Sequence, residues 1–339
     1  MTARLQLILM MCAIAIVTAI VSHGIVSWFR IEASPSGYWE VGQKRARQSA
    51  FLAGSSLAGY ALALGRIGDE LNMKIEGWGV AASSPSEWEQ FQIRATGSNL
   101  TIIVVSAYDL NEYFLSDFRA DVVPLRQTIE DLWHSQAEWS YSKRLVSLYP
   151  LSYLRVLFPT AGRSDGVMVG IREKLNNIRP SMLSVESESG PILTFNETSS
   201  AQEKKTQRVT DWSPSRTVRR LAVLRSLSQG KHGFNGPKQL ALHRMLHYAK
   251  QRDHAVVVVL PVSPIYAKEF LTSGVSREFE AALIEVQHSA PEANWIRLDH
   301  INELNSNEYF VDFVHMNWYG QMIATDAFLR QFRDLGILQ

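Results

Sequence analysis

Short apolar runs alternate along most of this chain with segments whose apolar residues recur at helical spacing. The runs expected to form buried strands cover residues 50–54, 73–80, 100–106, 254–261 and 295–298. Helical spacing is found between them, at residues 57–71, 85–95 and 237–251, and again at about 320–332. This alternation predicts an α/β fold in which a parallel sheet lies between two layers of helices.

A long interruption separates the third and fourth predicted strands, over about residues 112–235. It is much longer than an ordinary connection, so we expect an insertion of helices and loops. Residues 179–208 are rich in Ser, Glu, Lys and Thr, which favours an extended surface excursion. The apolar stretch 145–158 is expected either to pack in the core or to lie on a membrane or an integral partner.

The N-terminal residues have a different pattern. Residues 5–29 contain no Asp, Glu, Lys or Arg, and a run of this length can cross a hydrocarbon core of about 30 Å. We therefore expect an N-terminal transmembrane helix over residues 1–30, a linker over 31–47 and a folded domain over 48–339. A cleaved signal peptide is the alternative, but the run is long for one and no small-x-small cleavage site follows it.

Composition indicates a domain with a sizeable core. Hydrophobic residues make up 46% of the chain, charged residues 20%, and the formal net charge is +1. A nucleic-acid partner would need a basic face, so none is expected. The single cysteine, Cys12, lies in the N-terminal apolar run. The exported domain must therefore be held together by its core and not by disulfides.

A candidate nucleophile occurs where the first predicted strand gives way to a helix. Gly54, Ser55, Ser56 and Leu57 form this junction. A hydroxyl there projects from a strand end beside unpaired amides at a helix start, where developing negative charge is stabilised. The alternative is that Ser55 or Ser56 only caps the helix, since serine is favoured at that position.

A candidate base and its orienting carboxylate occur near the end of the chain. Asp312 and His315 are three residues apart, so the carboxylate can hold one imidazole nitrogen while the other faces a serine. Asp131 and His134 have the same spacing within an amphipathic helical pattern, so spacing alone is weak. Asp312 and His315 differ because they follow the last predicted strand, at the sheet edge where α/β sites form.

With these motifs the chain resembles the SGNH (GDSL-like) hydrolase superfamily, and within it the membrane-anchored DltD-like and alginate O-acetylation-like proteins. Residues 54–56, 108–111, 256–264 and 312–315 carry the resemblance. It implies a flavodoxin-like three-layer sandwich in which Ser56 is the nucleophile, His315 the base and Asp312 its orienter. Ser55 stands where the family usually has aspartate, a change typical of the DltD-like branch.

The resemblance also implies an oxyanion hole. Its backbone donors match Ser56 and Gly79, with Gly77 and Ala81 as alternatives to Gly79. The Gly-x-Asn-Asp block of the family is absent in literal form, and Asn111 is the candidate for the side-chain amide. Losing one oxyanion donor typically costs about 3–4 kcal/mol of transition-state stabilisation.

Aromatic and histidine side chains outside the triad suggest two further sites. Trp318 and Tyr319 follow His315 and either offer a flat apolar face to a sugar ring or pack in the core. His243 and His247 are four residues apart on a predicted helix, a spacing that suits zinc. No glutamate of the zinc-protease kind stands beside His243. We expect no metal and no cofactor.

Four arginines, Arg216, Arg219, Arg220 and Arg225, fall on one predicted helical segment. They form either a solvated face or a surface that approaches anionic lipid headgroups or an acidic polymer.

Together the residues and the resemblance predict a serine acyltransferase or esterase that works through an acyl-Ser56 intermediate. The resemblance implies a bacterial cytoplasmic-membrane protein with a periplasmic domain, a membrane-bound O-acyltransferase as partner, and an exported polysaccharide or cell-wall polymer as substrate. The alternative is a catalytically silent scaffold or binding subunit of a polysaccharide secretion or modification complex.

Overall fold

The computed structural model describes residues 10, 13–21, 49–80, 83–94, 99–114, 206–228, 230–250 and 254–337. Most of the expected anchor, the linker over 31–47 and most of the expected insertion, including 145–158, lie outside these ranges. Within the described ranges, no helix has the length and apolar character needed to span a membrane. All described residues from 49 onward belong to one compact unit.

The centre of this unit is a five-stranded, all-parallel sheet. In chain order its strands are β1 (Ser49–Ser55), β2 (Lys74–Val80), β3 (Leu100–Ser106), β4 (His254–Leu260) and β5 (Asn294–Arg297). Their order across the sheet is β2-β1-β3-β4-β5, the arrangement of flavodoxin-like folds. The predicted α/β class and parallel sheet are confirmed, with strand ends displaced by only a few residues.

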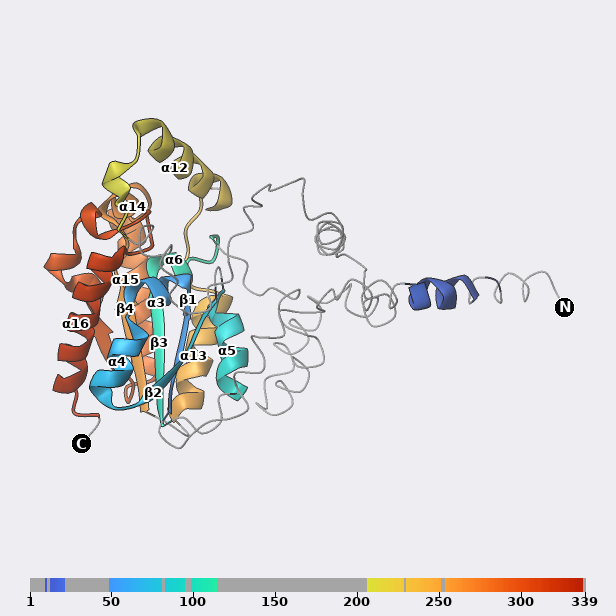
Figure 1. Ribbon diagram of the computed structural model, residues 1–339, viewed down its shortest axis with the longest axis horizontal. Helices are drawn as coiled ribbons and strands as arrows, with labels where there is room; N and C mark the ends of the chain where they lie inside the picture. Colours follow the sequence, from blue (N-terminus) through green and yellow to red (C-terminus); the bar gives the residue numbers. More distant parts are fainter. Residues whose placement is uncertain are drawn as a thin grey trace, which may run out of the picture. The chain divides into compact units, whose positions relative to one another are not determined.

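Helices cover both faces of the sheet (Figure 1). One face carries α3 (Ser56–Ala61), α4 (Leu64–Leu71) and α16 (Trp318–Asp334). The other carries α5 (Pro85–Arg94), α13 (Pro237–Lys250) and α15 (Ser273–Ser289). The shorter α6 (Ala107–Leu110) and α14 (Pro264–Phe270) follow β3 and β4, and α12 (Pro214–Ser228) precedes α13. The described part of the chain therefore has three layers.

The neighbouring interior strands β3 and β4 are buried almost throughout. Every residue of β3 is buried, as is every residue of β4 after His254. This explains why both strands read as continuous apolar runs and not as alternating ones, since helices exclude water from both sides of a parallel sheet. The carboxyl ends of these strands point to the edge where the chain becomes irregular between residues 298 and 317.

The predicted helix over 57–71 is divided in two. The chain leaves helical conformation at Leu62 and Ala63 and starts again at Leu64. At the break, the backbone N–H of Ala63 donates to the hydroxyl of Thr325 on α16, at 3.0 Å. A contact with a distant helix, which local spacing does not encode, replaces the helical hydrogen bond.

Gly54 allows α3 to pack closely against the sheet. A Cβ at this position would lie 2.6 Å from the Cβ of Ala58 and 3.3 Å from that of Val104. We expect Gly54→Ala to lower the free energy of unfolding by about 1–3 kcal/mol, because neither neighbour can move away without strain. Gly65→Ala is the matched control, since a Cβ there meets nothing within 4 Å.

The control should leave stability unchanged or raise it by up to about 1 kcal/mol, because alanine is the better helix former. Urea denaturation followed by circular dichroism measures both variants. Equal stability of the two alanine variants would contradict the close packing assigned to Gly54.

Candidate active site

The two adjacent serines at the end of β1 have different roles. Ser55 is the N-cap of α3, and its hydroxyl accepts a hydrogen bond from the backbone N–H of Leu57 at 3.2 Å. Ser56 is the first helical residue, and its hydroxyl is part-buried and lies at the carboxyl edge of the sheet. Capping therefore falls to Ser55, which leaves the Ser56 hydroxyl available for another partner.

That partner is His315. The hydroxyl of Ser56 lies 2.8 Å from Nε2 of His315, across 259 positions of sequence. Nδ1 of the same ring lies 2.8 Å from Oδ2 of Asp312. Because an ionised carboxylate can only accept, Nδ1 carries the proton and Nε2 of the neutral ring is free to accept the proton of Ser56. The structure thus brings the three predicted side chains into one continuous relay.

Asp312 is held rigidly at the far end of this relay. Its second oxygen, Oδ1, accepts the backbone N–H groups of Val314 at 2.9 Å and His315 at 2.8 Å. Burial alone would raise the pKa of Asp312, but the hydrogen bond and charge of His315 and the two backbone amides outweigh it. The pKa of this carboxyl consequently lies below its ordinary value, so Asp312 is ionised at neutral pH.

Tyr60 supports the imidazole from α3. Its ring centroid lies 4.7 Å from that of His315, with the two rings inclined at 59°. Sequence reasoning did not identify this residue. A signal was present, since Tyr60 follows Ser56 by four positions and one helical turn brings the two side chains to the same face.

The predicted backbone oxyanion donors differ in how close they lie to the turn that carries Ser56. Gly79 pairs with Gly54 in the register of β2 and β1, so its backbone lies beside the turn that carries Ser56. Gly77 pairs further back, with Leu52, and Ala81 lies outside the described residues. Gly79 is therefore nearer the Ser56 turn than Gly77 is.

Asn111 has other partners in the structure. Its Nδ2 lies 3.0 Å from Nδ1 of His232, and its Oδ1 accepts the backbone N–H of Tyr113 at 3.1 Å. The side chain is 1% exposed. Its amide therefore orders the loop that follows β3 and ties it to the segment after α12.

A buried carboxyl group, Asp109, lies beneath the nucleophile turn. It is 0% exposed, and its Oδ2 accepts the Ser106 hydroxyl at 2.8 Å. Burial raises its pKa to about 6, against the opposing effects of the Ser55 and Ser106 hydroxyls and of Lys238 and His315. Its other oxygen makes no hydrogen bond of ordinary geometry with the described residues. Sequence reasoning assigned no role to Asp109, although its position directly after a buried strand was a signal.

The raised pKa of Asp109 predicts that the difference in stability between the wild type and an Asp109→Asn variant depends on pH. Below the unfolded-state pKa, near 4, Asp109 is protonated in both states and has no effect. Between about pH 4 and 6 the unfolded chain ionises first, so the wild type loses stability as pH rises. Relative to the Asp109→Asn variant, whose side chain cannot ionise, the free energy of unfolding of the wild type should fall by about 2–3 kcal/mol across this window.

Urea denaturation of both proteins at pH 4, 5, 6 and 7 measures this difference. Any pH-independent effect of the asparagine on the free energy of unfolding cancels when the differences at these pH values are compared. A difference that stays the same from pH 4 to 7 would mean that the folded-state pKa of Asp109 is ordinary.

Trp318 and Tyr319 are surface residues and not core residues. They are 42% and 44% exposed, at the start of α16, with ring centroids 5.2 Å apart and rings nearly perpendicular. The Arg208 guanidinium lies 5.9 Å from the Tyr319 ring. The alternative of core packing is thereby removed, and a pair of exposed rings directly follows the triad loop.

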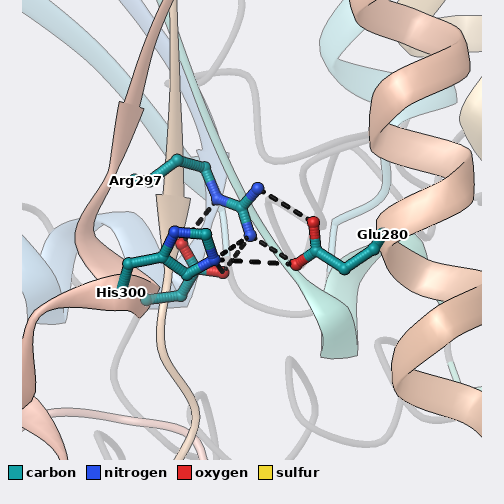
Figure 2. A network of polar contacts seen from close by, with 4 residues as sticks. Glu280, Arg297 and His300 are labelled. Carbon is teal, nitrogen blue, oxygen red and sulfur yellow. Dashed lines mark hydrogen bonds and ion pairs between the residues drawn. The ribbon is translucent and has the colours of Figure 1, made fainter.

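One group of possible metal ligands occurs among the described residues. Ligand atoms of Glu280, Asp299 and His300 all lie within 4.8 Å of one another. Figure 2 shows the guanidinium of Arg297 among them. It donates to Glu280 at 2.5 and 3.0 Å and to Asp299 at 2.7 and 2.8 Å. A cation would have to displace this bound positive charge, so the group is an ion-pair network that joins α15 to the end of β5.

His243 and His247 on α13 belong to no group of three possible metal ligands within the described ranges. Nδ1 of His243 lies 2.5 Å from the hydroxyl of Ser289 on α15, and burial lowers the pKa of this imidazole. Asp131 and His134, which share the spacing of Asp312 and His315, lie outside the described residues.

Comparison with known proteins does not assign this chain to a family. No protein-family model matches it, and a search of curated proteins finds no match. Function is therefore inferred from the side chains of the site.

Proposed function

We propose that this protein is a serine acyltransferase or esterase of the SGNH type, acting through an acyl-Ser56 intermediate. The observation that carries this proposal is the relay of two 2.8 Å contacts from Ser56 through His315 to Asp312. Its position adds support, because the relay lies at the carboxyl edge of a parallel sheet, where the sites of α/β enzymes form. These three groups are sufficient for nucleophilic acyl transfer without a cofactor.

The reaction begins at the Ser56 hydroxyl. As its oxygen bonds to the carbonyl carbon of an ester, its proton moves to Nε2 of His315, and the Asp312 carboxylate stabilises the resulting imidazolium. The tetrahedral intermediate then collapses, the carbon–oxygen bond of the ester breaks, and the imidazolium gives its proton to the departing alcohol. Water or a sugar hydroxyl attacks the acyl-serine in the same way, with His315 again acting as the base.

Negative charge on the carbonyl oxygen needs donors near Ser56. The Leu57 N–H is already bound by Ser55, so the Ser56 N–H at the start of α3 is the first candidate. The Gly79 backbone, beside the Ser56 turn, is the second. Asn111 is the third candidate, although its amide already contacts His232.

For the substrate we propose an exported polysaccharide or a cell-wall polymer, with O-acetylation as the reaction. This rests on the resemblance to membrane-anchored O-acetylation proteins and on the exposed rings of Trp318 and Tyr319, which suit a sugar face. A membrane-bound O-acyltransferase is the proposed partner, and the periplasmic side of a bacterial cytoplasmic membrane, reached through the N-terminal anchor, is the proposed location.

Turnover of p-nitrophenyl acetate by the purified full-length protein tests the reaction class. We expect release of p-nitrophenol, and its loss in Ser56→Ala and His315→Ala. Turnover that neither substitution changes would defeat the proposal. Addition of polysaccharide acceptors then separates transfer from hydrolysis, because transfer places the acetyl group on the polymer whereas hydrolysis yields free acetate.

A silent scaffold is the second candidate, because the Asn111 amide already contacts His232. A scaffold of this kind would bind the polymer but would not turn over the ester. Polymer binding by isothermal titration calorimetry, together with an absence of ester turnover, would favour it.

Tyr60 offers a test of how precisely the imidazole must be held. Tyr60→Ala removes the ring that packs on His315, and we expect kcat to fall by roughly 10- to 100-fold because the base can turn away from Ser56. Tyr60→Phe keeps the ring and should stay within about threefold of the wild type on the same reasoning. Ester kinetics measure both, and equal losses in the two variants would point to the Tyr60 hydroxyl instead.

A further inference from the structure

Helix α12 carries an exposed face in which arginine and aliphatic side chains occur together. Val223 and Leu227, one helical turn apart, are 41% and 52% exposed, while Val218, 65% exposed, lies on the other side of the helix. The helix contains no acidic residue. Neighbouring exposed apolar side chains of this kind mark a candidate site of interaction.

Two of the four arginines of α12 have partners among the described residues. Arg225 is paired with Glu269, and the guanidinium of Arg216 lies 4.0 Å from the centroid of the Trp212 ring. Arg219 and Arg220 are exposed, and within the described ranges neither forms an ion pair. Spacings of three and four residues place Arg216, Arg219 and Arg220 on one stripe with Val223 and Leu227. Cationic and apolar groups thus share one side of the helix, which we call the α12 face.

The α12 face is fixed at the edge of the sheet that carries the triad. The N–H of Val209, just before the helix, donates to the carbonyl of Phe310 at 2.7 Å. Trp212 packs on Phe313, with ring centroids 5.4 Å apart, and Phe313 directly follows Asp312. Figure 1 shows α12 beside α14, beyond the strand ends where α6 begins. These contacts tie the segment that leads into α12 to the triad loop.

Other exposed apolar groups gather near the same edge. Tyr113 is 45% exposed in the segment that follows α6, and Trp318 and Tyr319 are exposed just after His315. Leu240 and Ile284 are the remaining exposed large apolar side chains of the described α/β unit, and they lie on α13 and α15. Most of the exposed large apolar side chains of this unit therefore lie at or near the edge that carries Ser56.

A lipid surface is complementary to both kinds of group. Headgroups of anionic lipids attract arginines, while the acyl boundary receives aliphatic and aromatic side chains. An acidic polymer would satisfy the arginines but would leave Val223 and Leu227 in water. We propose that the α12 face binds the anionic surface of a lipid bilayer and so turns the Ser56 edge toward the membrane. This does not depend on the acyl-transfer proposal.

Fluorescence of a dye on the α12 face tests this interaction in the full-length protein. In a Cys12→Ser background, Val223→Cys is labelled with an environment-sensitive dye, and Ile284→Cys, 48% exposed on α15, is the matched control. Vesicles contain phosphatidylcholine alone or phosphatidylcholine with phosphatidylglycerol. We expect a blue shift at position 223 with the anionic vesicles only, reduced by high salt, and no change at position 284.

Charge removal provides the second arm of the test. Arg219→Ala combined with Arg220→Ala should weaken surface contact by roughly 25-fold, at about fivefold for each cation, and abolish the blue shift. Lys250→Ala combined with Arg330→Ala removes the same charge from α13 and α16 and should leave the shift intact. Emission at position 223 that is the same in both vesicle types would overturn the proposal. Emission that is already blue-shifted without lipid would also overturn it, because protein would then cover the α12 face.

Discussion

Ser56→Ala should lower kcat for an acetate ester by roughly 10⁴-fold or more while leaving the fold unchanged. The substitution removes the nucleophile itself, and enzymes with a triad keep only the residual rate due to binding and the oxyanion donors when one member is lost. Since the Ser56 hydroxyl contacts only His315 among the described hydrogen bonds, its loss should change the free energy of unfolding by less than about 0.5 kcal/mol.

Ser55→Ala is the matched control, because the neighbouring serine caps α3 and contacts no triad member. It should lower the free energy of unfolding by about 1 kcal/mol and reduce turnover far less than Ser56→Ala does. Ester kinetics and urea denaturation measured on both variants separate the two roles. A Ser56→Ala protein that keeps a tenth of the wild-type rate would rule out Ser56 as nucleophile.

Asp312→Asn should be nearly as damaging, with a loss of about 10⁴-fold in kcat. Two backbone N–H groups donate to Oδ1 of Asp312, so an asparagine there keeps its carbonyl toward them and points its NH2 group at His315. The Nδ1 atom of the imidazole must then accept, which moves the ring proton to Nε2. The base is left unable to take the proton of Ser56.

This reasoning predicts a specific ranking of variants. Asp312→Ala should be no worse than Asp312→Asn, because alanine does not force the wrong tautomer. Asp326→Asn makes the same chemical change on the exposed surface of α16, where Asp326 pairs with Arg66, and should leave kcat unchanged. An Asp312→Asn enzyme within tenfold of the wild type would show that the carboxylate does not set the state of His315.

Burial on both faces explains why the sheet could be predicted from sequence. The strands β3 and β4 read as uninterrupted aliphatic runs because helices cover both sides of them. The division of the helix after Ser56 could not be predicted in this way. It depends on Thr325, a residue more than two hundred positions away, which binds the backbone at Ala63.

The site shows the same contrast. Ser56, Asp312 and His315 could be identified because each has a local signal: a strand-to-helix junction for Ser56, and a three-residue spacing after the last strand for the other two. Asp109 was missed because its burial and its raised pKa arise from groups on several separate elements. The partner of Asn111, His232, lies at the far end of the long interruption, so no spacing in the sequence connects the two residues.

Detection of an acyl group on Ser56 tests the central claim most directly. The full-length protein is mixed with p-nitrophenyl acetate, quenched in acid during turnover and digested, and the peptides are sequenced by tandem mass spectrometry. We predict an acetyl group on Ser56 and not on Ser55. Acetylation of the peptide that contains Ser56 should exceed the background acetylation of the corresponding peptide from the Ser56→Ala protein. The acetyl group on Ser56 should be absent from His315→Ala. Steady turnover with Ser56 unmodified at every quench time, or labelling equal to that background, would contradict the acyl-Ser56 mechanism.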